Sequence, residues 1–130
     1  MKVAIPINNE LIAATFDFAS QLLIVTYKNK NVLDRIIINI NGPLPSLRAA
    51  QLKKLRINTL VCGAISTPLA TMIWHLNINI ISGISGRVDI VLKEFLNDSS
   101  GLFQYTLPGF TGKNWKGFCR RNVMRMKRNR

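Results

Sequence analysis

The sequence predicts an α/β fold in which helices cover both faces of a mixed five-stranded sheet. Short runs rich in β-branched residues alternate with segments of helical periodicity, which is typical of α/β proteins. Two such runs, residues 22–27 and 32–40, are separated by a short break rich in Asn and Lys. This spacing predicts a hairpin in which the second strand of the fold, 22–27, runs antiparallel to its neighbour. The central part of the chain then repeats a strand-helix unit twice, which predicts parallel strands joined by right-handed crossovers.

The first half of the chain begins with a strand at residues 2–7 and continues through a connection, residues 8–20, to the hairpin. Asn41-Gly42-Pro43 should end the hairpin, because glycine and proline interrupt strands. Residues 45–57 then predict a helix. Its expected apolar face consists of Leu44, Leu47 and Leu55.

Two strand-helix units make up the central part. Their expected bounds are 59–62 and 78–82 for the strands, and 68–76 and 88–97 for the helices. The first helix should have Thr67 as its N-cap and Pro68 as its first residue, since a hydroxyl and a proline favour these positions. The residues expected at core spacing are Leu69, Met72, Ile73 and Leu76 in the first helix, and Val88, Val91, Leu92 and Phe95 in the second.

The chain of 130 residues is expected to contain one domain, residues 1–100, followed by a C-terminal extension, residues 101–130. No apolar run approaches the roughly 20 residues that span a bilayer, so we expect a cytoplasmic protein without membrane contact. Eight of the 18 basic residues lie in residues 113–130, which contain no acidic residue. Most of the net charge of +12 therefore belongs to this tail, which we expect to be flexible.

The residues disfavour several kinds of catalysis. Nucleases built on three-layer α/β folds place acidic residues at strand ends to hold two metal ions, but here the first strand has none and the six acids are scattered. The lone histidine, His75, has no apparent acid partner and is expected to be an ordinary residue of a helix surface. Because no acid-base pair can be nominated, we do not expect an enzyme.

Small-residue turns follow both parallel strands at the carboxyl edge of the predicted sheet. The turn at 62–67 and the loop at 83–87 each open a helix, where free amide groups and the helix dipole favour anions. Glycines in the second loop allow close backbone approach, and Arg87 adds a positive charge. Cys62 is either a soft metal ligand at this edge or a small apolar residue that closes the core.

The order of these segments resembles the dinitrogenase iron–molybdenum cofactor-binding family, of the NifX and NifB C-terminal type. The resemblance covers about residues 1–98. It rests on the strand KVAIPI, the loop ending TFDFA, the turn LVCGAIS with the helix TPLATM, and a GxxG followed by V-x-x-V-x-x-x-F at 83–95. The resemblance implies a three-layer ribonuclease H-like fold without nuclease chemistry. It also implies a non-enzymatic protein that binds or carries an iron–molybdenum or other metal–sulfur cluster.

One departure from the family pattern concerns the expected ligands. The family commonly has His-Phe-Gly where this chain has Thr15-Phe16-Asp17. Thr15 cannot replace an imidazole ligand, and the carboxylate of Asp17 would repel an anionic cluster. If the usual histidine is a ligand, this chain lacks it.

The cluster site implied by the resemblance uses backbone amides at 63–67 and 84–87, with the 8–17 loop as a lid and Cys62 as the candidate metal ligand. The candidate cofactor-binding residues are Phe16, Cys62, Gly63, Ser66, Thr67, Gly83, Ser85, Gly86 and Arg87. A protein that donates or accepts the cluster is the expected partner.

An alternative reading assigns function to the basic tail. Cations interleaved with aromatic residues could contact phosphates and stack on bases, as in modules that bind a nucleic acid or an acidic partner. The candidate contacts are Lys113, Trp115, Lys116, Arg120 and Arg121.

Overall fold

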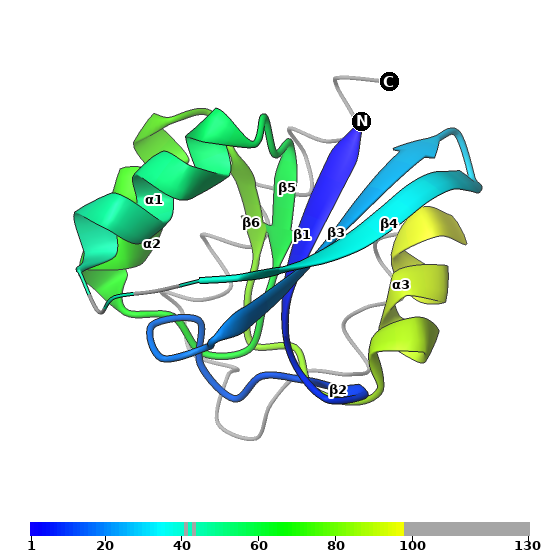
Figure 1. The fold of residues 1–130 in the computed structure, drawn as a ribbon, viewed down its shortest axis with the longest axis horizontal. Coiled ribbons are helices and arrows are strands. Elements are labelled where there is room, and N and C mark those ends of the chain that lie inside the picture. Colours follow the sequence, from blue (N-terminus) through cyan, green and yellow to red (C-terminus); the bar gives the residue numbers. More distant parts are fainter. Residues whose placement is uncertain (41, 43, 98–130) are drawn as a thin grey trace.

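The computed structural model describes residues 1–40, 42 and 44–97. These residues form a mixed sheet and three helices (Figure 1). The strands are β1 (Lys2–Asn8), β2 (Leu11–Ile12), β3 (Gln21–Lys28), β4 (Asn31–Asn39), β5 (Thr59–Val61) and β6 (Asn79–Ile81). The helices are α1 (Pro45–Lys54), α2 (Thr67–His75) and α3 (Val88–Asn97).

The sheet has the order β4-β3-β1-β5-β6, and β2 pairs with β1 beside this path. β5 runs parallel to β1 and to β6, whereas β3 is antiparallel to both β1 and β4. The predicted hairpin and the two parallel strand-helix units are therefore confirmed. The predicted number of strands is wrong by one, because the two-residue β2 folds back on β1 with Ile12 opposite Ile7. So short a segment has no pattern of its own in the sequence.

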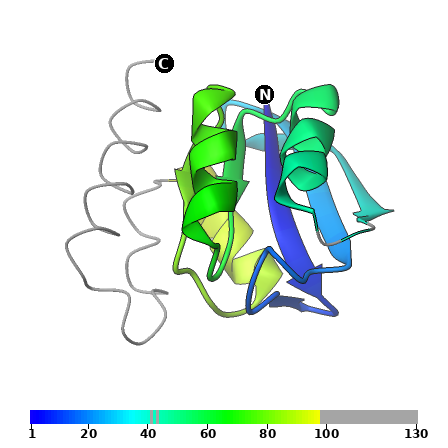
Figure 2. The ribbon, with the colours of Figure 1, turned by 90° about the vertical axis from the view of Figure 1, so that its left-hand side faces the viewer.

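The helices cover both faces of the sheet and give three layers. Figure 2, viewed from the side of α1 and α2, shows these two helices in front of the sheet and α3 behind it. Alternate residues of β1 point to opposite faces, so that Ile5 packs toward α3 and Ala4 toward α1 and α2. The predicted core residues of α3 are all buried, and the ring of Phe95 meets that of Tyr27 edge to face, with 5.7 Å between centroids.

The predicted buried face of α1 is wrong. Leu44 and Leu47 are each 56% exposed, and the helical face turned to the core consists of Arg48, Ala49 and Leu52. Of the predicted residues, only Leu55, at the C-cap, packs against the core. The three residues of the buried face have the right helical spacing, but the arginine interrupts the apolar pattern and hides it. The helix also ends at Lys54, earlier than predicted.

Two details of α2 differ from the prediction. Its N-cap is Ser66, whose side chain accepts a hydrogen bond from the amide of Leu69, so Thr67 is the first helical residue. Met72 is 40% exposed, whereas Leu69 and Ile73 are buried as predicted. His75 lies exposed in the last turn, which confirms its expected place on the helix surface.

The expected extension, residues 101–130, lies outside the described residues, and so do the predicted tail contacts Lys113, Trp115, Lys116, Arg120 and Arg121. None of the helices in the described part of the chain is both long and apolar enough to span a bilayer.

Candidate functional site

Three loops meet at the carboxyl ends of β1, β5 and β6. We call this surface the loop edge and define it as residues 13–20, 62–67 and 83–87. The amide of Ala64 donates to the carbonyl of Ala14 (2.8 Å), and the amide of Phe16 donates to the carbonyl of Ala64 (2.9 Å). The amide of Gly83 donates in turn to the carbonyl of Gly63 (2.8 Å). Both predicted turns and Phe16 are thus part of one hydrogen-bonded edge.

Gly63 allows the first loop to cross the end of β5. A Cβ atom at this position would lie 2.6 Å from the carbonyl oxygen of Ala14 and 2.7 Å from that of Ala13. Both neighbours are backbone atoms, so a side chain at position 63 would force the loop away. The glycine is needed here for close approach.

Asp17 lies at the N-terminus of α2. One oxygen of its carboxylate accepts from the amide of Ser66 (2.8 Å), and the other accepts from the Ser66 hydroxyl (2.6 Å). The N-terminus of a helix is a preferred position for an anion, because free amides and the helix dipole favour negative charge there. At α2 this position is already taken by a carboxylate of the chain itself.

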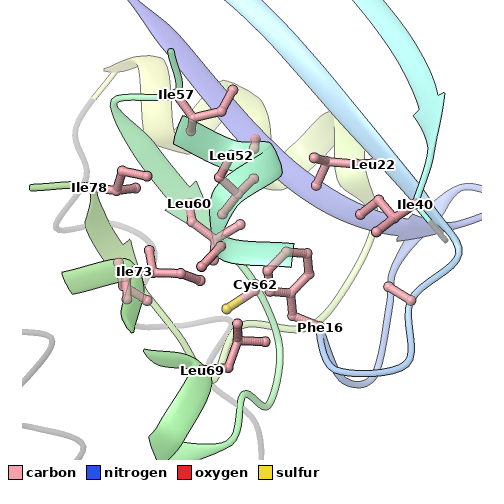
Figure 3. Close-up of a cluster of buried hydrophobic side chains, with 14 of the residues drawn as sticks. Phe16, Leu22, Ile40, Leu52, Ile57, Leu60, Cys62, Leu69, Ile73 and Ile78 are labelled. Carbon is pink, nitrogen blue, oxygen red and sulfur yellow. The ribbon is translucent and has the colours of Figure 1, made fainter. Parts of the chain in front are cut away.

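Cys62 begins the second loop of this edge, and its side chain is fully buried beneath the surface. Figure 3 shows its sulfur within the hydrophobic cluster, near Phe16 and Leu69. Burial, helped by the negative charge of Asp17, raises the pKa of the Cys62 thiol far above its usual range, so the thiol is protonated at neutral pH. This placement matches the reading of Cys62 as a core residue, and it does not offer the sulfur to a metal ion at the surface.

Arg87 carries the positive charge that was predicted at the mouth of α3. Its guanidinium lies 3.5 Å from the carboxylate of Glu10 and 3.4 Å from that of Asp89. The loop before it is tied to β2, because the amide of Ile12 donates to the carbonyl of Gly86 (3.0 Å). Two acidic groups therefore offset the charge of Arg87, so it offers little net attraction for an external anion.

Arg48 contacts the first loop of this edge, and the sequence patterns missed it. It is 5% exposed, and its Nη1 donates to the carbonyl oxygens of Phe16 (3.0 Å) and Ala19 (2.8 Å). Its Nε donates to the carbonyl of Gly42 (3.0 Å), and its guanidinium lies over the Phe16 ring, 5.8 Å from the centroid. Burial lowers the pKa of Arg48, and the nearby Asp17 opposes this effect. The available signal was an arginine at helical spacing with Ala49 and Leu52.

A cavity of about 280 Å³ lies beside the first loop. The polar side chains in its lining are all uncharged, and they belong to Asn8, Thr15, Ser20 and Gln21. Within residues 1–40, 42 and 44–97, no three His, Cys, Asp or Glu side chains are grouped closely enough to hold a metal ion. The loop edge and the cavity beside it thus present hydroxyl, amide and backbone groups, with the carboxylate of Asp17 and the guanidinium of Arg87.

Comparison with known proteins assigns the chain to a family. The model of the family described as "Dinitrogenase iron-molybdenum cofactor" matches residues 1–98. No curated protein sequence matches the chain significantly. Solved structures share the fold, with identities below 25%, and the chain covers most of each of them.

One such structure, PH0822, has a TM-score of 0.70 and 19% identity, over 75% of this chain and 89% of that one. A protein of Methanocaldococcus jannaschii described as a candidate dinitrogenase has a TM-score of 0.62 and 24% identity, over 75% and 88%. A Thermotoga protein described as a candidate NifB protein has a TM-score of 0.58 and 15% identity, over 75% and 88%. Since the family model covers three quarters of the sequence, the chain belongs to the dinitrogenase iron–molybdenum cofactor family.

Proposed function

We propose that this protein is a non-enzymatic accessory protein that binds a metal–sulfur cargo, related to the iron–molybdenum cofactor, at the loop edge. The observation that carries the proposal is the joining of three loops into one edge in a chain of this family. The bonds between Ala14, Phe16 and Ala64 and the bond between Gly63 and Gly83 make this edge a continuous surface.

The side chains at the edge favour recognition of the cargo through its sulfides. Proteins hold metal–sulfur clusters through thiolate or imidazole ligands, and hydrogen bonds to the cluster sulfurs orient and tune them. Hydroxyl and amide donors of Thr15, Ser20 and Gln21 line the cavity beside the first loop. In this arrangement Cys62 is buried, so the metal ions would keep ligands from the cargo itself or from a partner. A protein that donates or accepts the cargo fits this requirement.

The proposal is tested by anaerobic reconstitution of the reduced full-length protein. The protein is incubated with iron, sulfide and either molybdate or tetrathiomolybdate, desalted, and analysed for metal content and visible absorption. Stoichiometric metal with sulfur-to-metal charge-transfer bands is the expected result. Absence of both would overturn the proposal.

A matched pair of variants locates the cargo on α2. Thr67→Ala removes an exposed hydroxyl from the first residue of α2 at the loop edge, whereas Thr71→Ala removes an exposed hydroxyl from the middle of the same helix. We expect reduced loading in the Thr67 variant alone. Equal loading in both variants would place the cargo elsewhere.

A further inference from the structure

We infer that residues 14–19 form a lid over the thiol of Cys62, and that Asp17 and Arg48 hold this lid shut from opposite sides. The lid itself does not depend on any cargo. Its consequence is control over when the buried thiol can react, whether or not the protein binds the cargo proposed above.

The ends of the lid are fixed in the sheet. The amide of Ala13 donates to the carbonyl of Pro6 in β1 (2.9 Å), and the carbonyl of Ser20 accepts from the amide of Ile40 (2.9 Å). Among the described residues, the one strand-like pairing of the segment between these anchors is the bridge of Thr15 with Ala64. An opening of the lid would therefore involve residues 14–19 and leave the sheet in place.

Asp17 holds the lid on the side of α2. Both oxygens of its carboxylate bond to Ser66, at 2.8 and 2.6 Å, and Ser66 is fixed as the N-cap of the helix. Hydrogen bonds to an ionised acceptor are stronger than those between neutral groups. This pair links the lid to the turn at 62–67 through two hydrogen bonds.

Arg48 holds the lid on the side of α1. Its guanidinium bonds to the carbonyl oxygens of Phe16 and Ala19 and covers the Phe16 ring. A buried arginine that donates to backbone carbonyls fixes the path of that backbone. The lid is thus clamped between two helices of the same layer.

Phe16 is the side chain that seals the thiol. Its exposed fraction is 0%, and it packs in the same cluster as Cys62 (Figure 3). Phe18, two residues away at the apex of the lid, is 81% exposed. If the lid opens, Phe16 leaves the cluster and water reaches the sulfur. The desolvation that raises the thiol pKa is then relieved, and a thiolate becomes available.

The test measures how fast the Cys62 thiol reacts in the native protein, without metal. All variants carry Cys119→Ser, so that Cys62 is the single thiol of the chain. An aromatic disulfide reagent is added at pH 8 in a series of urea concentrations below the unfolding transition. Asp17→Ala removes both bonds to Ser66, while Asp34→Ala removes an exposed acid of β4 and serves as the control.

We expect Asp17→Ala to react at least about tenfold faster than the parent, a factor that corresponds to about 1.4 kcal/mol. The rate should depend weakly on urea, because a local opening exposes little surface. Asp17→Asn and Arg48→Lys, which keep part of the contacts, should give intermediate rates and serve if the alanine variant does not fold. The control should react at the parental rate.

Two outcomes would overturn the lid. One is an equal reaction rate in the parent, the Asp17 variants and Arg48→Lys. The other is a rate that follows global unfolding, with the full urea dependence of the unfolding free energy. Both outcomes are independent of the metal content measured in the reconstitution experiment. A result that overturns the lid can therefore be distinguished from one that overturns the proposed function.

Discussion

The carboxylate of Asp17 accepts hydrogen bonds from both the amide and the hydroxyl of Ser66, at the first turn of α2. The sequence predicted an anion at this helix mouth and also predicted that Asp17 would repel one. This contact reconciles the two predictions, because the carboxylate of Asp17 is itself the anion at the N-terminus of α2. A negatively charged ligand must displace this carboxylate or bind beside it.

Removing the charge of Asp17 should therefore strengthen the binding of an anionic cargo. Asp17→Asn leaves an amide oxygen that can still accept from Ser66, so the loop is expected to keep its place. We expect tetrathiomolybdate to bind roughly tenfold more tightly at low ionic strength, since a like charge within a few ångströms has been removed. Anaerobic titration followed by visible absorption gives the affinity.

The control for this prediction is Asp34→Asn, which removes one charge from an exposed position on β4. It should leave the affinity unchanged. The gain at Asp17 should also shrink as salt is added, because mobile ions screen charges near the surface. A gain that both variants share would point to net charge rather than to the mouth of α2.

The two phenylalanines of the first loop should differ sharply in their contribution to stability. Phe16 is fully buried, and Phe18 is 81% exposed. Phe16→Ala should lower the free energy of unfolding by about 3–5 kcal/mol, the usual range for a buried aromatic ring. Phe18→Ala should change it by less than about 0.5 kcal/mol. Urea denaturation followed by circular dichroism provides both values, and similar losses would contradict the described loop.

Strong local patterns made most of the fold predictable. In α3 four apolar residues recur at helical spacing, and all four are buried. The hairpin of β3 and β4 was predicted from two β-branched runs around a short break. The buried face of α1 was missed because Arg48 occupies a core position, where its charge is satisfied by backbone carbonyls far away in sequence. No local pattern encodes such partners.

The loop edge was predictable in outline and not in its contacts. Both turns were expected at the carboxyl ends of parallel strands, and the structure brings them together. The bond between Asp17 and Ser66 joins residues 49 positions apart, so neither residue reveals it alone. The burial of Cys62 likewise depends on Phe16, which comes from a distant segment. Periodicity describes one element at a time, whereas these contacts depend on how elements pack.

Two glycines should respond to an added methyl group for different reasons. Gly63→Ala places a Cβ against the backbone oxygens of Ala13 and Ala14, and we expect a loss of about 1–3 kcal/mol in unfolding free energy. Gly42 has open space around it, but its φ of +87° is unfavourable for alanine, so Gly42→Ala should cost about 1 kcal/mol. Urea denaturation measures both. If the Gly63→Ala protein is as stable as the parent, the backbone of Ala13 and Ala14 does not approach Gly63 as closely as described.

The buried thiol of Cys62 should make stability depend on pH in the alkaline range. Burial raises its pKa in the folded protein, while the unfolded chain keeps the ordinary value of 9.0. Below that pH both states hold the proton, and the thiol contributes no pH dependence. Above it the unfolded state loses the proton and the folded state keeps it, so stability falls by about 1.4 kcal/mol per pH unit.

Cys62→Ala isolates this contribution, because it has no thiol to ionise. In a Cys119→Ser background, the parent should be the more stable protein at pH 7, since the sulfur fills space among Phe16, Leu69 and Ile73. Its advantage over the alanine variant should shrink steadily between about pH 9.5 and 11, at the slope given above. Urea unfolding of both proteins at each pH provides the difference. A constant difference would show that the folded thiol ionises as readily as the unfolded one, which is incompatible with a sulfur sealed beneath Phe16.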